Sequence, residues 1–238
     1  MKVFIITDNK WWLGQARKLF KVKNVEVEFY CSPKGEQIFA EEIKCQTIKP
    51  LNIKENVKYL IDTFDLGFSL HCKQIFPAEL VKSVRCINVH PGLNPYNRGW
   101  FPQVFSILNK KPAGATIHLM DEEVDHGEII VQKEVETYEW DTSKTIYDRI
   151  LSMELELLES RLESILHEQY VSTPMIEKGN YNGIKDYNSL LEIDLTQELT
   201  MKEAIDYLRA LTHPPYKNAY FLTESGEKVY LSLSLEKI

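Results

Sequence analysis

The sequence lacks the cysteine and glycine patterns that mark several common sites. Its four cysteines include no Cys-x-x-Cys pair, and no pair of histidines completes a zinc pattern (Cys31, Cys45, Cys72 and Cys86). We therefore expect free thiols in a reducing cytoplasm rather than disulfides or a metal site. No Gly-x-Gly-x-x-Gly follows the first apolar segment, so a bound dinucleotide is not indicated.

Positive charge is also scarce, and long apolar runs are absent. The chain has 28 lysines and arginines against 35 aspartates and glutamates, which gives a net charge of -7. A protein that binds tRNA or DNA usually carries a basic surface, so this balance argues against a nucleic-acid partner. No segment is long enough to span a membrane, and the N-terminal run lacks a signal-peptide cleavage pattern. We expect a cytoplasmic protein with no membrane partner.

Apolar segments with strand and helix periodicity alternate through the first half of the chain. Predicted strands lie at 3–7, 25–30, 66–70, 86–89, 115–120 and 128–135, and predicted helices at 11–22, 57–64, 78–83 and 101–109. This alternation favours the α/β class, with a Rossmann-like, mainly parallel sheet and flanking helices. In such sheets, ligands bind beyond the carboxyl ends of the strands.

Two further features follow the predicted sheet. Asp141 begins a long amphipathic helix whose acidic residues fall mostly on the outer face (Glu154, Glu156, Glu159 and Glu163). After a polar segment at 177–183, a helix at 201–211 and a β-hairpin at 219–222 and 228–233 form a small C-terminal unit. We therefore expect a main domain at 1–176 and a C-terminal helix and hairpin region at 177–238.

Three polar side chains near the ends of predicted strands form the strongest chemical pattern. Asn88 lies near the end of the strand at 86–89, His90 follows it directly, and Asp125 lies between the next two strands. An asparagine can donate a hydrogen bond to a developing oxyanion, a histidine can accept a proton near neutral pH, and an aspartate can orient the imidazole or handle that proton. No serine or cysteine stands beside the histidine as a nucleophile. The pattern favours acyl transfer to an amine that the substrate supplies.

Two segments together resemble the signature of the folate-dependent formyltransferase family. They are residues 87–99 (INVHPGLNPYNRG) and 114–130 (GATIHLMDEEVDHGEII). The resemblance is strong over residues 65–135 and weaker at 207–221 (YLRALTHPPYKNAYF), which is similar to the segment that leaves the catalytic domain in the tRNA and sugar formyltransferases. Gly92 stands where a serine is usual, and Asn97 where a tyrosine often precedes Arg-Gly. The second departure could reshape the pocket for the amine substrate.

The resemblance implies a Rossmann-like catalytic domain, at 1–176 here, that holds N10-formyltetrahydrofolate as the formyl donor and needs no metal. The family's catalytic asparagine, histidine and aspartate correspond to Asn88, His90 and Asp125. Asn88 and a protonated His90 stabilise the oxyanion, and His90 and Asp125 remove and relay the amine proton, with the direction of proton flow left open. The pterin is expected to lie against backbone in two loops (Lys73, Gln74 and Ile75; Asp121 and Glu122).

The remaining histidines of these two segments have ordinary explanations. His118 lies in the middle of a predicted strand, where a structural role is expected. His126 is next to Asp125 and either touches the substrate or faces solvent. The spacing of His90, His118 and His126 is poor for a zinc site.

Among the acceptors usual for the family, the sequence fits nucleotide-linked amino sugars best. Initiator-tRNA enzymes carry a longer, basic C-terminal domain, and glycinamide ribonucleotide enzymes would not need the C-terminal hairpin. The resemblance implies dTDP-4-amino-4,6-dideoxyglucose, a precursor of formylated O-antigen and lipopolysaccharide sugars, as the acceptor. A UDP-amino sugar and glycinamide ribonucleotide are the alternative acceptors.

A nucleotide sugar needs flat aromatic faces for its base, and cations or amides for its diphosphate and sugar. The candidates are three aromatic residues, three cations and two asparagines (Trp11, Trp100 and Tyr216; Lys10, Arg98 and Lys217; Asn9 and Asn218).

Two other classes of function stay open at this point. A hydrolase would release formate from formyl-folate with water in place of the amine, and a non-catalytic folate- or nucleotide-binding relative would not need the three polar residues together. Formate release without an amine acceptor would favour the hydrolase.

The predicted hairpin presents an edge strand that can pair across a twofold axis, so we expect a homodimer.

Overall fold

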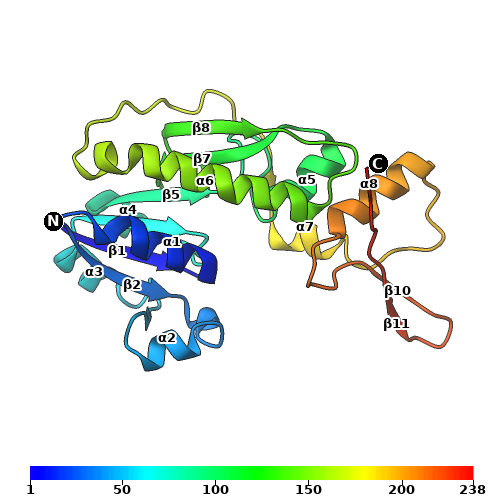
Figure 1. Ribbon diagram of the computed structural model, residues 1–238, viewed down its shortest axis with the longest axis horizontal. Helices are drawn as coiled ribbons and strands as arrows, with labels where there is room; N and C mark the ends of the chain where they lie inside the picture. The colour runs from blue at the N-terminus through cyan, green and yellow to red at the C-terminus, as the bar shows by residue number, and fades with distance from the viewer. Residues whose placement is uncertain (238) are drawn as a thin grey trace. The chain divides into compact units, whose positions relative to one another are not determined.

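A seven-stranded sheet organises the computed structural model, which describes residues 1–237 (Figure 1). The strand order is β3-β2-β1-β4-β5-β7-β8. The strands are β1 (Lys2–Thr7), β2 (Glu26–Cys31), β3 (Lys49–Pro50), β4 (Leu66–Leu70), β5 (Arg85–His90), β7 (Ala113–Leu119) and β8 (Ile129–Val135). The first five of these pair in parallel, and β7 runs antiparallel to β5. The prediction of a mainly parallel, Rossmann-like α/β sheet is confirmed.

The helices follow the strands along the chain. They are α1 (Lys10–Lys21), α2 (Ala40–Lys44), α3 (Val57–Thr63), α4 (Ala78–Ser83), α5 (Pro102–Asn109), α6 (Ser143–Leu166), α7 (Ile184–Asn188) and α8 (Met201–Leu211), with a short 3-10 helix η1 at Pro33–Gly35. Side-chain caps fix two of the starts: Asn9 accepts the first free N–H groups of α1, and Thr200 forms a capping box with Glu203 in α8. No helix within residues 1–237 is both long and apolar enough to cross a membrane.

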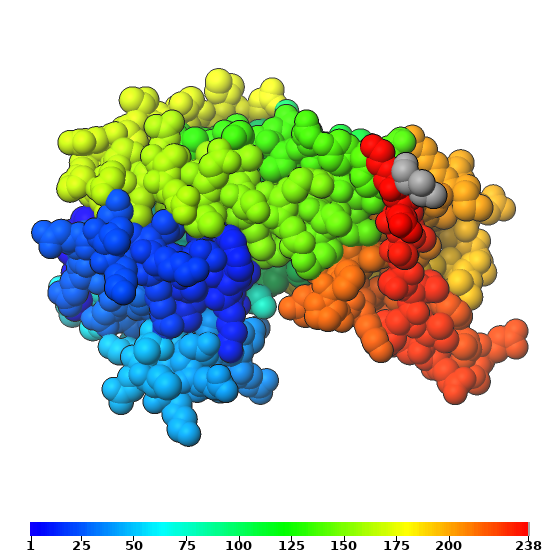
Figure 2. Space-filling view, in the orientation of Figure 1, coloured from blue at the N-terminus to red at the C-terminus, as the bar shows by residue number. Residues whose placement is uncertain are grey.

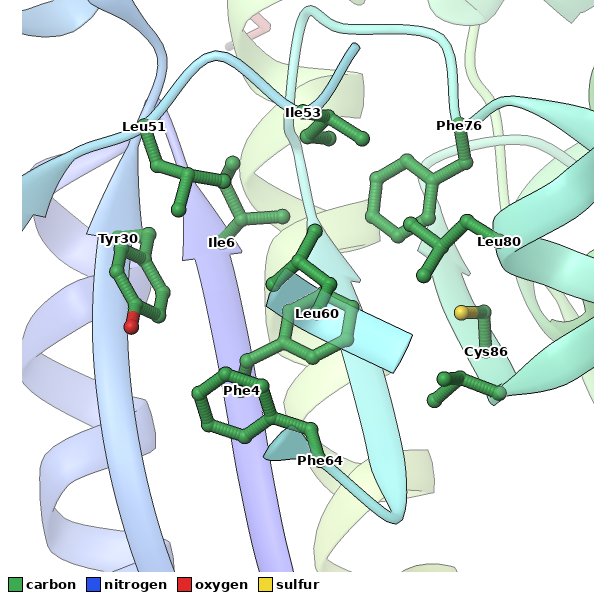
Figure 3. Close-up of a cluster of buried hydrophobic side chains, with 11 residues drawn as sticks. Phe4, Ile6, Tyr30, Leu51, Ile53, Leu60, Phe64, Phe76, Leu80 and Cys86 are labelled. Atoms are coloured by element: carbon green, nitrogen blue, oxygen red, sulfur yellow. The ribbon is translucent and has the colours of Figure 1, made fainter. Parts of the chain in front are cut away.

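Aromatic and aliphatic side chains together fill the core beside the parallel strands (Figure 3). Phe4 in β1 is fully buried, and its ring lies 5.4 Å from that of Phe64 and 6.1 Å from that of Phe76, measured between centroids. Gly67 in β4 makes room for it, because a Cβ at that position would lie 2.2 Å from the Phe4 ring. This contact packs the start of β4 against β1, its neighbour in the sheet.

Helix α6 differs from the expected pattern at one acidic position. Glu156, Glu159 and Glu163 are exposed, as the amphipathic spacing predicts. Glu154 is fully buried, so its placement on the outer face is wrong. Its two carboxylate oxygens each lie 2.9 Å from Nε2 of His71, which is distant in sequence. Helical periodicity cannot reveal such a partner, and a buried carboxylate is tolerated only where one exists.

The chain divides into two compact units. The first consists of residues 1–90, 116–131 and 154–176, and the second of residues 91–115, 132–153 and 177–238. Strands β7 and β8 and helix α6 contribute to both units. The expected boundary near residue 176 coincides with the end of the last segment of the first unit. The division into a domain at 1–176 and a region at 177–238 stays a prediction.

The second unit contains two small sheets besides its helices. Strand β6 (Arg98–Gly99) pairs in parallel with β9 (Tyr181–Asn182), and β10 (Tyr220–Leu222) pairs antiparallel with β11 (Lys228–Tyr230). The β10–β11 hairpin lies at the surface of this unit, where Figure 2 shows it in orange-red. The expected C-terminal helix and hairpin are therefore present. The two-residue strands and the five-residue helices were not predicted, because they are too short to show a period.

The four cysteines differ in exposure, which predicts their reactivity. Cys45 is exposed, whereas Cys31 and Cys86 are buried and burial raises the pKa of their thiols to about 11 and about 12. Burial also raises the pKa of Cys72. Because only thiolates are alkylated quickly, we expect iodoacetamide to modify Cys45 alone in the native protein and all four cysteines after denaturation, as counted by intact mass. Fast modification of Cys86 in the native state would contradict this packing.

A second expectation concerns Glu28, on β2. Burial would raise the pKa of its carboxyl group, but hydrogen bonds from Lys2, Tyr30 and Lys49 outweigh that effect and lower the pKa to about 2. The Glu28 carboxylate therefore binds a proton more readily in the unfolded chain than in the folded protein. The stabilisation of the folded state by this group is complete above the ordinary pKa of 4.5 and is lost as the pH falls towards 2. We expect Glu28→Gln to cost about 1–3 kcal/mol of unfolding free energy near pH 7.

Urea denaturation across an acid series measures this effect. The difference between wild type and Glu28→Gln should shrink as the pH is lowered. Glu26→Gln on the same strand is the matched control, since Glu26 is mostly exposed and its oxygen lies 3.4 Å from Nζ of Lys2. A loss for Glu28→Gln that stays constant with pH would show that the ion pairs are not its cause.

Candidate active site

Strand β5 presents Asn88 and His90 on one face of the sheet, because side chains two residues apart in a strand point the same way. His90, the last residue of the strand, is 3% exposed. The neighbouring strand β4 pairs with β5 at Ser69 and Leu70, and β7 pairs with it on the other side. Both polar side chains are thus held in the middle of the sheet rather than on a mobile edge.

Asp125 reaches these residues from the loop between β7 and β8. Its φ is 50°, in the left-handed region that a residue with a Cβ adopts at a cost, as is common at functional sites. The loop can close because of Gly127, where a Cβ would lie 1.9 Å from the carbonyl oxygen of Leu119. Backbone geometry therefore turns the Asp125 carboxylate back onto the sheet.

The carboxylate of Asp125 contacts both residues of β5. Nδ2 of Asn88 donates to Oδ1 of Asp125 at 2.8 Å, and Nδ1 of His90 lies 3.5 Å from Oδ2. The side chains of His90 and Asp125 are 4% and 10% exposed. All three belong to the first unit. The structure brings together the amide, imidazole and carboxylate that the sequence analysis selected.

His118 is a further member of this cluster that the sequence analysis treated as structural. It lies directly opposite Asn88 in the antiparallel pairing of β5 with β7. Nδ1 of His118 donates to the carbonyl of Leu119 at 2.7 Å, so Nε2 is the accepting nitrogen and lies 3.2 Å from Nδ2 of Asn88. It also lies 3.8 Å from Oδ1 of Asp125. The register of β5 against β7 would have revealed this contact, but that register cannot be read from the periodicity of either strand alone.

This arrangement can donate a hydrogen bond and move a proton in a nearly water-free place. The Asn88 amide supplies the donor, and a histidine whose ring is oriented by a carboxylate can take or give a proton. Within residues 1–237, no group of three or more His, Cys, Asp or Glu side chains has the arrangement of a metal site.

The two loops expected to contact the pterin both lie in the first unit. Lys73 and Ile75 point outward, with Ile75 62% exposed, while the Gln74 side chain bonds to the backbone of the 51–53 segment. In the second loop, Asp121 lies 2.7 Å from Nδ1 of His126, and Glu122 lies 2.5 Å from Nζ of Lys82.

The candidates for binding the sugar nucleotide are divided between the two units. At the start of α1, in the first unit, the Asn9 side chain accepts the N–H groups of Trp11 and Trp12. Lys10 forms an ion pair with Glu42 at 3.2 Å, and Trp11 is 37% exposed. The α1 terminus therefore presents one aromatic face and one partly neutralised cation.

In the second unit, Arg98 lies in β6 and is buried, and Trp100 donates its backbone N–H to Asn182. Tyr216 is 70% exposed, and the ammonium group of Lys217 lies 5.8 Å from the Tyr230 ring. The Asn218 side chain donates to the carbonyl of Leu211, so its amide is used inside the protein.

Asn97, which departs from the common family pattern, is the centre of a buried amide network. Its Nδ2 donates to Ser106 at 3.0 Å, and its Oδ1 accepts from Asn109 and Asn180, each at 2.7 Å. A tyrosine could not make these bonds from the same position. The network fixes the turn before Arg98 within the second unit.

Two family models match the chain. The model described as formyl transferase matches residues 3–162, and that described as the N-formyltransferase dimerization C-terminal domain matches residues 186–237. The chain is also 39% identical, over 99% of its length and 97% of the relative's, to the dTDP-4-amino-4,6-dideoxyglucose formyltransferase of Mycobacterium bovis.

Solved structures agree with these matches. A 4-N formyltransferase from Francisella tularensis is 53% identical, covers 100% of this chain and 98% of its own, and superposes with a TM-score of 0.96. PseJ from Anoxybacillus kamchatkensis, solved with UDP-4,6-dideoxy-4-formamido-L-AltNAc and tetrahydrofolate, is 26% identical over 88% of this chain and 98% of its own, with a TM-score of 0.65.

Proposed function

The chain belongs to the formyltransferase family, and from that premise we propose that it moves a formyl group from N10-formyltetrahydrofolate to the amine of dTDP-4-amino-4,6-dideoxyglucose. The observation that carries the proposal is the contact of Asp125 with both Asn88 and His90, which sets a hydrogen-bond donor beside a proton-transfer pair. The name of the Mycobacterium bovis relative supports this choice of sugar. A role in O-antigen or lipopolysaccharide synthesis follows from that sugar.

The residues present fit a folate donor. The loop at 71–75 is fixed by side chains beneath it and exposes Ile75, and Val124 is a second exposed apolar residue near Asp125. Pterin recognition through backbone groups and apolar contacts is consistent with both loops. The tetrahydrofolate in the PseJ structure supports the same donor class. When bound, the donor supplies an electrophilic formyl carbon.

The side chains of β5 and Asp125 then have distinct roles in the proposed reaction. Asn88 Nδ2 exchanges its longer hydrogen bond, to Nε2 of His118, for one to the formyl oxygen as the amine attacks and negative charge develops there. His90 turns Nδ1 toward Asp125, so we assign proton exchange with the substrate to Nε2. Asp125 holds the imidazole in this orientation and stabilises its protonated form. The amine loses a proton, and the folate nitrogen gains one as it leaves.

For the acceptor, we assign the roles separately within each unit. In the first unit, Trp11 offers an aromatic face and Lys10 a cation, beside Asn9. In the second unit, we assign the contacts for the base, sugar or diphosphate to five residues (Arg98, Trp100, Tyr216, Lys217 and Asn218). The engaged amide of Asn218 makes a structural role its main one.

We also propose that the protein is a homodimer that pairs through its C-terminal region. The dimerization domain model that matches residues 186–237 supports this. The same region exposes several large apolar side chains, which an interface would cover (Met201, Leu222, Val229 and Tyr230). Light scattering during gel filtration should give twice the mass of the chain; a monomer at working concentration would contradict the proposal.

Turnover with N10-formyltetrahydrofolate and dTDP-4-amino-4,6-dideoxyglucose tests the function, with the formylated sugar identified by mass spectrometry. Product from wild type that is lost in His90→Ala and Asp125→Ala would support both the reaction and the residues. Product with only a UDP-amino sugar or glycinamide ribonucleotide would correct the acceptor. Formate release without transfer to any amine would overturn the transferase proposal in favour of a hydrolase.

A further inference from the structure

Residues 71–75, between β4 and α4, form a short loop that is anchored from three directions (the folate loop). Its side chains alternate between the interior and the surface: Cys72 packs against the core cluster, while Lys73 and Ile75 are exposed. The loop follows directly after β4, beside the strand that carries Asn88 and His90. Its anchors all belong to the first unit.

The first anchor is the His71–Glu154 pair. His71 has a φ of 57°, so its backbone leaves β4 in the left-handed region. Nε2 of His71 lies 2.9 Å from both carboxylate oxygens of Glu154, which is fully buried in α6. The centroids of the His71 ring and the buried Trp12 ring are 6.0 Å apart. A buried carboxylate is costly unless it is paired, so the position of Glu154 in the core depends on its contact with His71.

The second anchor is Asp8, which follows β1. Its Oδ2 accepts the backbone N–H of Lys73 at 2.8 Å, and its Oδ1 accepts the backbone N–H of Ser32 at 2.9 Å. One buried carboxylate thereby ties the loop after β4 to the loop after β2. Hydrogen bonds to a charged acceptor are stronger than those between neutral groups.

The third anchor is the side chain of Gln74. It donates to the carbonyl of Leu51 at 2.9 Å and accepts the backbone N–H of Ile53 at 3.0 Å. With these contacts, the loop is bonded to α6, to the end of β1 and to the segment before α3.

We propose that Glu154, acting through His71, is a positioning residue that holds the folate loop in its donor-binding form before the donor arrives, with Asp8 as the second fixed point. This inference rests on the proposed function. A loop ordered in advance lowers the conformational entropy lost on binding, so its benefit is expected in affinity for the folate. The proton transfer is assigned to a different pair, His90 and Asp125, so the chemical step should change little.

The test compares Glu154→Gln with Glu159→Gln, the same substitution at an exposed position of α6. Glutamine keeps the volume and one accepting oxygen, but it replaces the second oxygen beside Nε2 of His71 with an NH2 group that cannot accept a hydrogen bond. We expect Glu154→Gln to raise the Kd of 5-formyltetrahydrofolate, measured by calorimetry, about tenfold, and Glu159→Gln to leave it unchanged. The KM for the folate donor should rise by a similar factor, while the KM for the amino sugar and kcat at saturating donor stay the same.

Hydrogen exchange of the ligand-free enzyme gives a readout that does not depend on activity. Amides of residues 71–75 should exchange faster in Glu154→Gln than in wild type, with the rest of the sheet unaffected. His71→Asn is the second variant, because asparagine tolerates the left-handed backbone of this position and replaces the imidazole with a shorter amide. It should behave as Glu154→Gln does, and it decides the matter if Glu154→Gln does not fold.

Three results would overturn the inference. Unchanged exchange of the 71–75 amides would show that the pair does not hold the loop, and faster exchange with an unchanged folate Kd would show that loop order is irrelevant to binding. Equal rises in the KM of both substrates would show a general structural role. If wild type does not bind 5-formyltetrahydrofolate, the proposed function fails instead, while the exchange comparison still decides whether Glu154 orders the loop.

Discussion

Replacing Asp125 by asparagine is expected to lower kcat by about 1,000-fold while the folate Kd changes little. The carboxylate accepts a hydrogen bond from Asn88 and faces Nδ1 of His90, so it needs acceptor oxygens on both sides. An amide would turn its NH2 group against one of these donors and would carry no charge to stabilise a protonated imidazole. Steady-state kinetics with saturating donor and acceptor measure the loss.

Glu123→Gln is the matched control for this variant. Glu123 lies on the same loop and is exposed, so loss of its charge should leave kcat within about twofold of wild type, as for most surface substitutions. The thermal midpoint of Asp125→Asn should also stay close to that of wild type. If Asp125→Asn retains most of its activity, the carboxylate does not orient His90 during the reaction and the proposed mechanism is wrong.

Asn88→Ala is expected to lower kcat by about 100–1,000-fold, the usual cost of losing one oxyanion donor. The amide is held by Asp125 and by Nε2 of His118, which fix the direction of its N–H groups before the substrate binds. The N–H group that faces His118 at 3.2 Å then has only to change its acceptor to the formyl oxygen as charge develops. Alanine removes the donor and leaves the strand register intact, so folding should be preserved.

The pH–rate curve separates this role from proton transfer. An amide does not ionise, so Asn88→Ala should lower the rate by the same factor at every pH and keep the shape of the wild-type curve. Asp125→Asn removes a group that takes part in proton transfer, so the shape of its curve should change. A changed curve for Asn88→Ala would indicate that the asparagine acts mainly by orienting Asp125 rather than by binding the oxyanion.

The sheet and the three polar residues were predictable for the same reason. Apolar segments such as 66–70 and 86–89 are short, buried and bounded by turn signals, so their period and their ends can be read locally. Asn88 and His90 are two residues apart on one such segment, which places them on one face whatever the rest of the chain does. The C-terminal hairpin was predictable in the same way, from two strand-like runs joined by a turn.

The contacts around these residues were not predictable in this way. Glu154 follows the spacing of an exposed helix face, and only the packing of α6 brings it to His71. His118 was assigned a structural role because it lies in the middle of a predicted strand, but the antiparallel register places it opposite Asn88. Asp8 and Lys73 are likewise joined only by the neighbouring positions of β1 and β4.

By itself, the sequence determined the α/β class, the strand that carries Asn88 and His90, and the family to which the chain belongs. Those properties depend on local periodicity and on residues close together in the chain. Only the tertiary structure decided which buried groups pair, namely Asp125 with Asn88 and His90, and Glu154 with His71. The physical reason is that a buried polar group must find its partner in space, and the register of strands and the packing of α6 set which partner it meets.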